Sequence, residues 1–242
     1  PHYIAYAHSN LGTLYLQLGE YSKAEVEFRK GIKVKPNLPT NYLNLGTIFA
    51  SQGHYRKAKE AYEKAETLYK NYNWGYKVPK ELYVNKARTL LTLGLLKEAE
   101  SSAKLALGTA QGHFILGKIY TSMEKHEEAL GEYDTIHKYE LLGNGPELKA
   151  RAHNNRALIL VKQYHLNDAI RELKQAIAIY PNLYDAHYNL GNALIQSNGD
   201  PIMARNHFEI ALKISNTKES QKRIKRALKN LNLDFQGEME AN

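Results

Sequence analysis

Apolar residues recur along most of this chain at spacings of three and four, the period of one face of an α-helix. One such run is AHYNLGNALIQ, residues 186–196. Each run is short, and a turn such as LGEY (18–21) or QGHY (52–55) separates it from a second apolar run. Gly and polar residues at such points are typical of tight turns. The pattern therefore predicts pairs of short helices joined by turns, that is, helical hairpins.

The predicted hairpins repeat along the chain. The Leu11-Gly12 pair returns 34 residues later as Leu45-Gly46, and the Ala and the aromatic residue of the second run return at the same spacing. A fixed period of about 20–50 residues is typical of solenoids, in which each repeat is one supersecondary unit that buries its apolar face against its neighbours. We therefore expect an array of repeats in place of a single central core.

This pattern resembles the tetratricopeptide repeat family, in which a bulky residue is followed by Leu-Gly, an aromatic residue, Ala, a second aromatic residue, Ala and Pro. In the first repeat these positions are His8, Leu11, Gly12, Tyr15, Ala24, Phe28, Gly31 and Pro36. The resemblance implies an all-α fold, a right-handed superhelical solenoid of helix-turn-helix hairpins with a C-terminal capping helix.

We expect one continuous array with six repeats. Their ranges are 5–38, 39–72, 80–109 (short), 110–143, 150–183 and 184–218, and a capping helix follows at 219–233. Insertions at 73–79 and 144–149 interrupt the period. The only Trp, Trp74, lies in the first insertion, and we expect it to anchor that loop over the second repeat. Positions are counted below from the first residue of each repeat.

Asparagine recurs at position six of the first helix. It is present as Asn10, Asn44, Asn85, Asn155 and Asn189, and only the fourth repeat differs, with Ile115. Asn in a helix interior is about 0.7 kcal/mol less favourable than Ala, so helix propensity does not explain this choice. Positions two, five, six, nine, twelve and thirteen share one face of the first helix. One interpretation of the recurring Asn is that its side-chain amide hydrogen-bonds to an adjacent hairpin and only stabilises the stack of repeats.

A primary amide offers one acceptor and two donors, which match the C=O and N–H groups of an extended peptide backbone. We therefore expect the asparagines to form a ladder along a concave groove. Basic residues on the same face in the middle repeats favour an acidic group on the ligand. The candidate peptide-binding residues are Asn10, Asn44, Asn85, Asn155, Asn189, Thr13, Arg88, Lys118, Arg151 and Asn192.

Two more specific resemblances bear on this groove. The stretch AHYNLGNAL resembles the repeats of O-linked N-acetylglucosamine transferase, which implies asparagines that line the superhelix interior and bind a substrate backbone. Only the repeat part is similar, so the resemblance implies recognition without transferase activity. The co-chaperone repeats that clamp a C-terminal carboxylate are a poorer match, because only Asn44 occupies one of their five ligand positions.

Composition excludes several classes of function. The chain has no Cys, which rules out disulfides and thiolate metal sites within it, and none of its apolar runs approaches the roughly 18 residues of a membrane span. No Ser-nucleophile, phosphate-loop or zinc-protease motif is present. Histidine occupies position four in four repeats, where we expect it to pack one hairpin against the next. We expect no enzyme activity, no cofactor and no metal.

The net charge is +8, and Lys and Arg gather in residues 218–229. This cluster suits the polar outer face of a terminal cap, so we do not expect nucleic-acid binding. The chain opens on Pro1, so we expect it to be a segment of a longer protein. The sequence leaves the oligomeric state open, and it favours the cytoplasm only slightly as a compartment.

Taken together, the sequence predicts a non-catalytic scaffold that binds a protein or peptide ligand. Three alternatives stay open. The segment is the substrate-recruiting arm of a larger enzyme such as a glycosyltransferase, it binds RNA along its basic surfaces, or it serves assembly by self-association.

Overall fold

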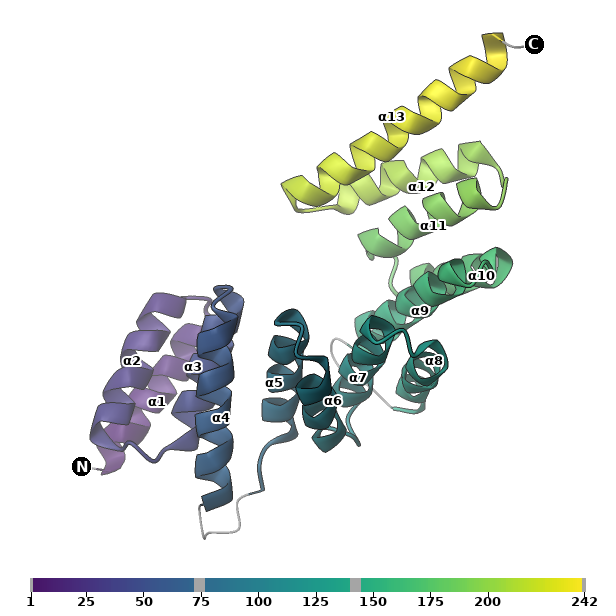
Figure 1. Cartoon of the computed structure of the whole chain (residues 1–242). Coiled ribbons are helices and arrows are strands. Elements are labelled where there is room, and N and C mark those ends of the chain that lie inside the picture. The colour runs from purple at the N-terminus through teal and green to yellow at the C-terminus, as the bar shows by residue number, and fades with distance from the viewer. Residues whose placement is uncertain (1, 72–76, 140–144, 241–242) are drawn as a thin grey trace. The chain divides into compact units, whose positions relative to one another are not determined.

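A computed structural model describes residues 2–71, 77–139 and 145–240, and for residue 2 and residues 232–240 only the backbone. These ranges contain helices and no strand (Figure 1). The helices are α1 (His2–Gln17), α2 (Tyr21–Val34), α3 (Pro39–Ser51), α4 (Tyr55–Asn71), α5 (Lys80–Thr92), α6 (Leu96–Leu105), α7 (Ala110–Ser122), α8 (His126–Thr135), a 3-10 turn (Ile136–Lys138), α9 (Gly145–Lys162), α10 (Leu166–Ile179), α11 (Tyr184–Gln196), α12 (Pro201–Ile214) and α13 (Lys218–Glu240). Trp74 and the expected ends of the second and fourth repeats lie outside the described residues.

The chain forms two compact units, Pro1–Met123 and Glu124–Asn242. In the first unit, α1 pairs with α2, α3 with α4 and α5 with α6, and each pair packs on the next. In the second unit, α9 pairs with α10 and α11 with α12, and α13 packs on α12. Each unit is therefore a stack of helical hairpins, as the apolar pattern predicts.

The turn inside each hairpin is closed by one residue in the left-handed region. Gly19, Gly53 and Gly94 have φ of 75°, 79° and 75° at position fifteen. The Gly53 and His54 amides then donate to the Ala50 and Phe49 carbonyls at 3.1 and 2.8 Å, which satisfies the end of α3. This turn needs a residue that tolerates positive φ, and Gly does so without strain.

The core is a ribbon of small and aromatic side chains between helices. The Ala near the start of the second helix is fully buried in all six expected repeats. It stands at position twenty as Ala24, Ala58, Ala99, Ala129 and Ala169, and at position twenty-one as Ala204, because the last turn is one residue longer. Ile48 on α3 is also fully buried, in a cluster with Phe28 of the preceding hairpin. Leu14 holds the same position on α1 and is 51% exposed. Burial at this position therefore depends on the hairpin that packs against it.

The C-terminal helix is longer than the sequence predicts. It begins at Lys218 and continues to Glu240, beyond the expected end at residue 233. Ile224 and Leu231 are buried in the core of the second unit, so the apolar face packs as expected for a capping helix. None of the described helices has the length and apolar content needed to cross a membrane.

Histidine at position four contacts the preceding repeat, as expected, and also its own hairpin. The His153 ring lies 4.4 Å from the ring of His137 in the 3-10 turn, and His187 Nε2 lies 3.0 Å from the Pro181 carbonyl. His8 Nδ1 lies 2.6 Å from Glu27 Oε2, and His153 Nδ1 lies 2.8 Å from Glu172 Oε2. Each of these two His–Glu pairs joins the two helices of one hairpin. The reason is that position four of the first helix faces position twenty-three of the second across the same hairpin.

Candidate peptide-binding site

The position-six asparagines are distributed over both units. Asn10, Asn44 and Asn85 lie on α1, α3 and α5 in the first unit, and Asn155 and Asn189 lie on α9 and α11 in the second. Asn10 is exposed, and the other four are half-buried. Within each unit, the helical repeat therefore places these amides at one recurring position of successive first helices.

Three of the asparagines already bond neighbouring side chains. Asn189 Nδ2 donates to Asn154 Oδ1 at 2.8 Å, and Asn155 Nδ2 donates to the Tyr133 hydroxyl at 3.3 Å. Asn44 Nδ2 contacts Thr13 Oγ1 at 3.4 Å, a long and weak hydrogen bond. In the second unit, the hydrogen bonds of Asn155 and Asn189 therefore connect α8, α9 and α11. This is the contact expected if these amides stabilise the stack of hairpins.

The remaining candidate peptide-binding residues differ in exposure and in the bonds that they already make within the chain. Thr13 donates to the Ser9 carbonyl at 2.9 Å. Arg151 pairs with Glu147 one helical turn earlier at 2.7 Å, a solvated ion pair of modest strength. Lys118 is exposed on α7, and Asn192 is half-buried on α11.

Position five does not belong to the open face, contrary to the sequence analysis. Ser9 and Leu43 are each 7% exposed. Ser9 Oγ donates to Asn41 Oδ1 at 2.6 Å, between α1 and α3. Position five turns toward the neighbouring first helix, so the open face is narrower than the sequence suggests.

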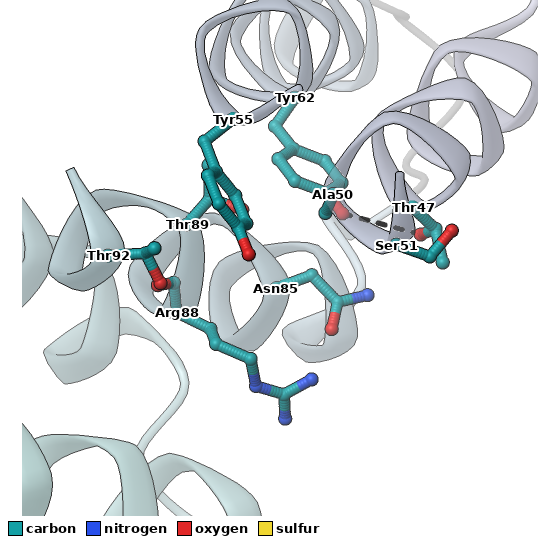
Figure 2. Close-up of a pocket in the computed structure, with 9 residues that line it drawn as sticks. All are labelled: Thr47, Ala50, Ser51, Tyr55, Tyr62, Asn85, Arg88, Thr89 and Thr92. Atoms are coloured by element: carbon teal, nitrogen blue, oxygen red, sulfur yellow. Dashed lines mark hydrogen bonds between the residues drawn. The ribbon is translucent and has the colours of Figure 1, made fainter. Parts of the chain in front are cut away.

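A pocket of about 280 Å³ lies between α3, α4 and α5 in the first unit. Figure 2 shows Asn85 and Arg88 extending from α5, with the Tyr55 and Tyr62 rings entering from α4. The lining residues are Thr47, Ala50, Ser51, Tyr55, Tyr62, Asn85, Arg88, Thr89 and Thr92. This pocket brings together two of the sequence-predicted residues, Asn85 and Arg88.

The pocket is rich in hydrogen-bond donors and has no carboxylate among its lining residues. Burial raises the pKa of Tyr62 to about 12, although its hydrogen bond with Thr47 and the nearby charge of Arg88 oppose the shift. Tyr62 therefore stays protonated at neutral pH and donates to Thr47 Oγ1 at 3.4 Å. In the described part of the chain, the side chains of Asn85 and Arg88 have no hydrogen bond or ion pair. The site suits an acceptor, above all a carboxylate.

Sequence reasoning missed the two tyrosines of this pocket. Tyr62 holds the second aromatic position of the repeat pattern, so only packing was expected of it, yet its hydroxyl reaches the pocket wall. Tyr55 follows the turn at 52–54, as Tyr21 follows the turn of the first repeat 34 residues earlier, and this recurrence was the signal that could have found it. Among the described residues, no group of three or more metal-binding side chains gathers at this pocket or elsewhere.

Comparison with protein families agrees with the hairpin geometry. Models described as tetratricopeptide repeat match residues 5–38, 39–72 and 80–113, and a model described as TPR repeat matches residues 157–198. Human protein O-mannosyl-transferase TMTC1 is 26% identical over 209 residues, 85% of this chain and 22% of the relative. The chain thus spans about a fifth of that relative's length.

Solved structures share the fold at lower identity. The apo form of the quorum sensor NprR from B. thuringiensis is 20% identical with a TM-score of 0.77, and the match covers 95% of this chain and 69% of that one. A chain of the APC/C hetero-tetramer Cut9-Hcn1 is 19% identical with a TM-score of 0.74, covering 93% and 43% respectively. The repeating hairpins, the buried alanines and these matches establish that the chain belongs to the tetratricopeptide repeat family.

Proposed function

We propose that this chain is a scaffold that binds an extended peptide or protein segment along the open faces of α1, α3 and α5. One observation carries the proposal. Asn85 and Arg88 line a common pocket, and neither side chain has a hydrogen bond or ion pair in the described part of the chain. Polar groups without a structural partner, placed side by side in a hollow, are typical of a binding site.

The two side chains suit different parts of a peptide. The Asn85 amide can donate to a backbone C=O and accept from a backbone N–H. The planar Arg88 guanidinium can hold a carboxylate through two parallel hydrogen bonds. The volume of about 280 Å³ lies at the lower end of small-molecule pockets. It therefore fits one acidic side chain of a longer ligand better than it fits a cofactor.

Selection from a displayed library of random peptides tests this function. The wild-type chain is expected to enrich peptides that share an Asp or Glu. A variant with Asn10→Ala, Asn44→Ala and Asn85→Ala is expected to lose the enrichment, because the backbone contacts are gone. Arg88→Gln is expected to retain binding but lose the acidic preference. A matched control replaces exposed asparagines outside this face, Asn37, Asn167 and Asn206, with Ala.

Two results would contradict the proposal. The first is a wild-type chain that enriches no peptide. The second is an asparagine variant that selects the same peptides as wild type. Circular dichroism melts of each variant separate lost binding from lost folding.

The transferase match favours a second candidate function, in which the array recruits substrates for a larger enzyme. Its basis is the 26% identity to a protein named as an O-mannosyl-transferase. If this function holds, peptides selected by the array act as preferred mannose acceptors when they are incubated with the full-length protein and a mannose donor. Equal transfer to selected and scrambled peptides would argue against it.

A further inference from the structure

A second hollow, of about 550 Å³, lies in the first unit between α2, α3 and α4. It uses another face of α3, because Tyr42, Leu45 and Phe49 recur at spacings of three and four, out of phase with Thr47 and Ser51 of the first pocket. The floor of this α2–α4 groove is apolar, and its rim is charged. The floor is Ile32, Tyr42, Leu45, Phe49 and Ala61, and the rim is Arg29, Lys33, Lys57, Glu60 and Lys64.

The rim carries four cations and one carboxylate. Three of the cations, Lys33, Lys57 and Lys64, have no carboxylate within ion-pair distance among the described residues. Arg29 is already bonded to Glu25 at 2.7 Å. Unpaired lysines around an apolar floor leave both a positive potential and uncovered apolar surface at one place.

Other lysines of the same unit, outside the α2–α4 groove, form ion pairs. Lys59 on α4 lies 3.1 Å from Glu98 on α6. Lys86 on α5 lies 2.7 Å from Glu66, which also binds Lys70 at 2.6 Å. Lysines along α4 and α5 are therefore paired where carboxylates stand opposite them. The α2–α4 groove departs from this arrangement.

We propose that the α2–α4 groove binds a short acidic peptide segment that carries apolar side chains. The lysines on the rim complement Asp and Glu residues, and the floor takes Leu- or Phe-like side chains. A nucleic acid fits less well, since the Arg29 guanidinium already lies over the Phe49 ring at 6.0 Å, where a base would stack. This site is separate from the Asn85 and Arg88 pocket and does not depend on its function.

Fluorescence anisotropy with a synthetic probe tests the proposal. The probe is a labelled peptide that alternates Asp or Glu with Leu and Phe, and the protein is the whole chain. The triple variant Lys33→Gln, Lys57→Gln and Lys64→Gln is expected to bind it about tenfold more weakly, because three solvated ion pairs each contribute roughly twofold to threefold. A charge-matched control, Lys97→Gln, Lys174→Gln and Lys213→Gln, is expected to bind within about twofold of wild type.

Additional probes and variants show where on the protein the acidic peptide binds. A probe with Ser in place of Leu and Phe is expected to bind more weakly, which shows use of the apolar floor. Binding of the original probe is expected to survive Asn85→Ala with Arg88→Gln; its loss there would place the probe in the first pocket and overturn the proposal. Equal affinity of the two triple-lysine variants, or tighter binding of a single-stranded oligouridylate than of the acidic probe, would overturn it as well.

Discussion

Gly191 on α11 lies against the ring of Phe208 on α12 so closely that an added Cβ would stand 2.6 Å from the Phe208 Cε1 atom. Gly12 faces Phe28 and Gly46 faces Tyr62 in the same way, at 2.8 and 2.5 Å. Each glycine is the Gly of a Leu-Gly pair, and each ring is the second aromatic residue of its repeat. The Leu-Gly signature therefore has a steric cause, because the first helix rests its backbone on the ring of the second.

We predict that Gly191→Ala destabilises the chain by about 1–2 kcal/mol, because overpacking against the ring outweighs the better helix propensity of Ala. The fifth repeat holds Ala157 and Leu173 at the same two positions. Combining Gly191→Ala with Phe208→Leu should therefore cost less than the sum of the single changes. Urea unfolding followed by circular dichroism measures all three variants. A more stable single Gly191→Ala variant would refute the steric explanation.

Truncating the side chain at the same repeat position on α3 and on α1 should lower the free energy of unfolding by unequal amounts. Ile48→Ala removes a side chain that is fully buried, and we expect a loss of about 2–5 kcal/mol in the free energy of unfolding. Leu14→Ala acts on a side chain that is 51% exposed, and we expect a loss below about 1 kcal/mol. The comparison uses denaturant midpoints under identical conditions. Similar losses would mean that Leu14 is covered in solution.

The left-handed turn position offers a stabilising substitution. Tyr164 has φ of 61° where the first three hairpins have Gly, and its side chain is 88% exposed. Tyr164→Gly should raise the free energy of unfolding by about 0.5–1 kcal/mol, because relief of the left-handed strain exceeds the entropic cost of Gly. Gly53→Tyr should do the reverse, since a Cβ there meets nothing within 4 Å and only the backbone is affected. A lower melting temperature for Tyr164→Gly would contradict this.

The pair of His187 and His207 should make the second unit sensitive to acid. Their Nδ1 atoms lie 3.0 Å apart, and His187 Nε2 lies 3.0 Å from the Pro181 carbonyl. When His187 donates to that carbonyl, its Nδ1 accepts from His207, so the neutral pair is satisfied. Burial lowers the pKa of both residues, and for His207 the charges of His187 and Lys174 add to the effect.

A lowered folded-state pKa means that the unfolded chain binds more protons below about pH 6.5. This contribution to stability is therefore complete above that value and is lost as the pH falls through the folded-state pKa. Glu27, Glu66 and Glu172 also have lowered pKa values, so their contributions are lost only in more acidic solution. We expect urea midpoints to fall between about pH 7.5 and pH 5.5, and to fall less in His207→Gln. An equal fall in wild type and variant would exclude this pair as the cause.

The candidate site was only partly predictable. The sequence singles out position six by its recurring Asn. It could not show that Asn155 and Asn189 bond Tyr133 and Asn154, whereas Asn85 has no such partner among the described residues. Partners of this kind come from the neighbouring hairpin, tens of residues away. Periodicity along one helix carries no information about them.

The sequence by itself determined the hairpins, their turns and the family, because each depends on local spacing: apolar residues three and four apart, a residue that tolerates positive φ at the turn, and Gly opposite an aromatic ring. The tertiary structure decided how each repeated residue is used. Leu14 and Ile48 hold one position, as do Asn85 and Asn155, yet they differ in exposure or in bonding. Burial and pairing in a solenoid depend on what the neighbouring hairpin presents, and those side chains lie a whole repeat away in the chain.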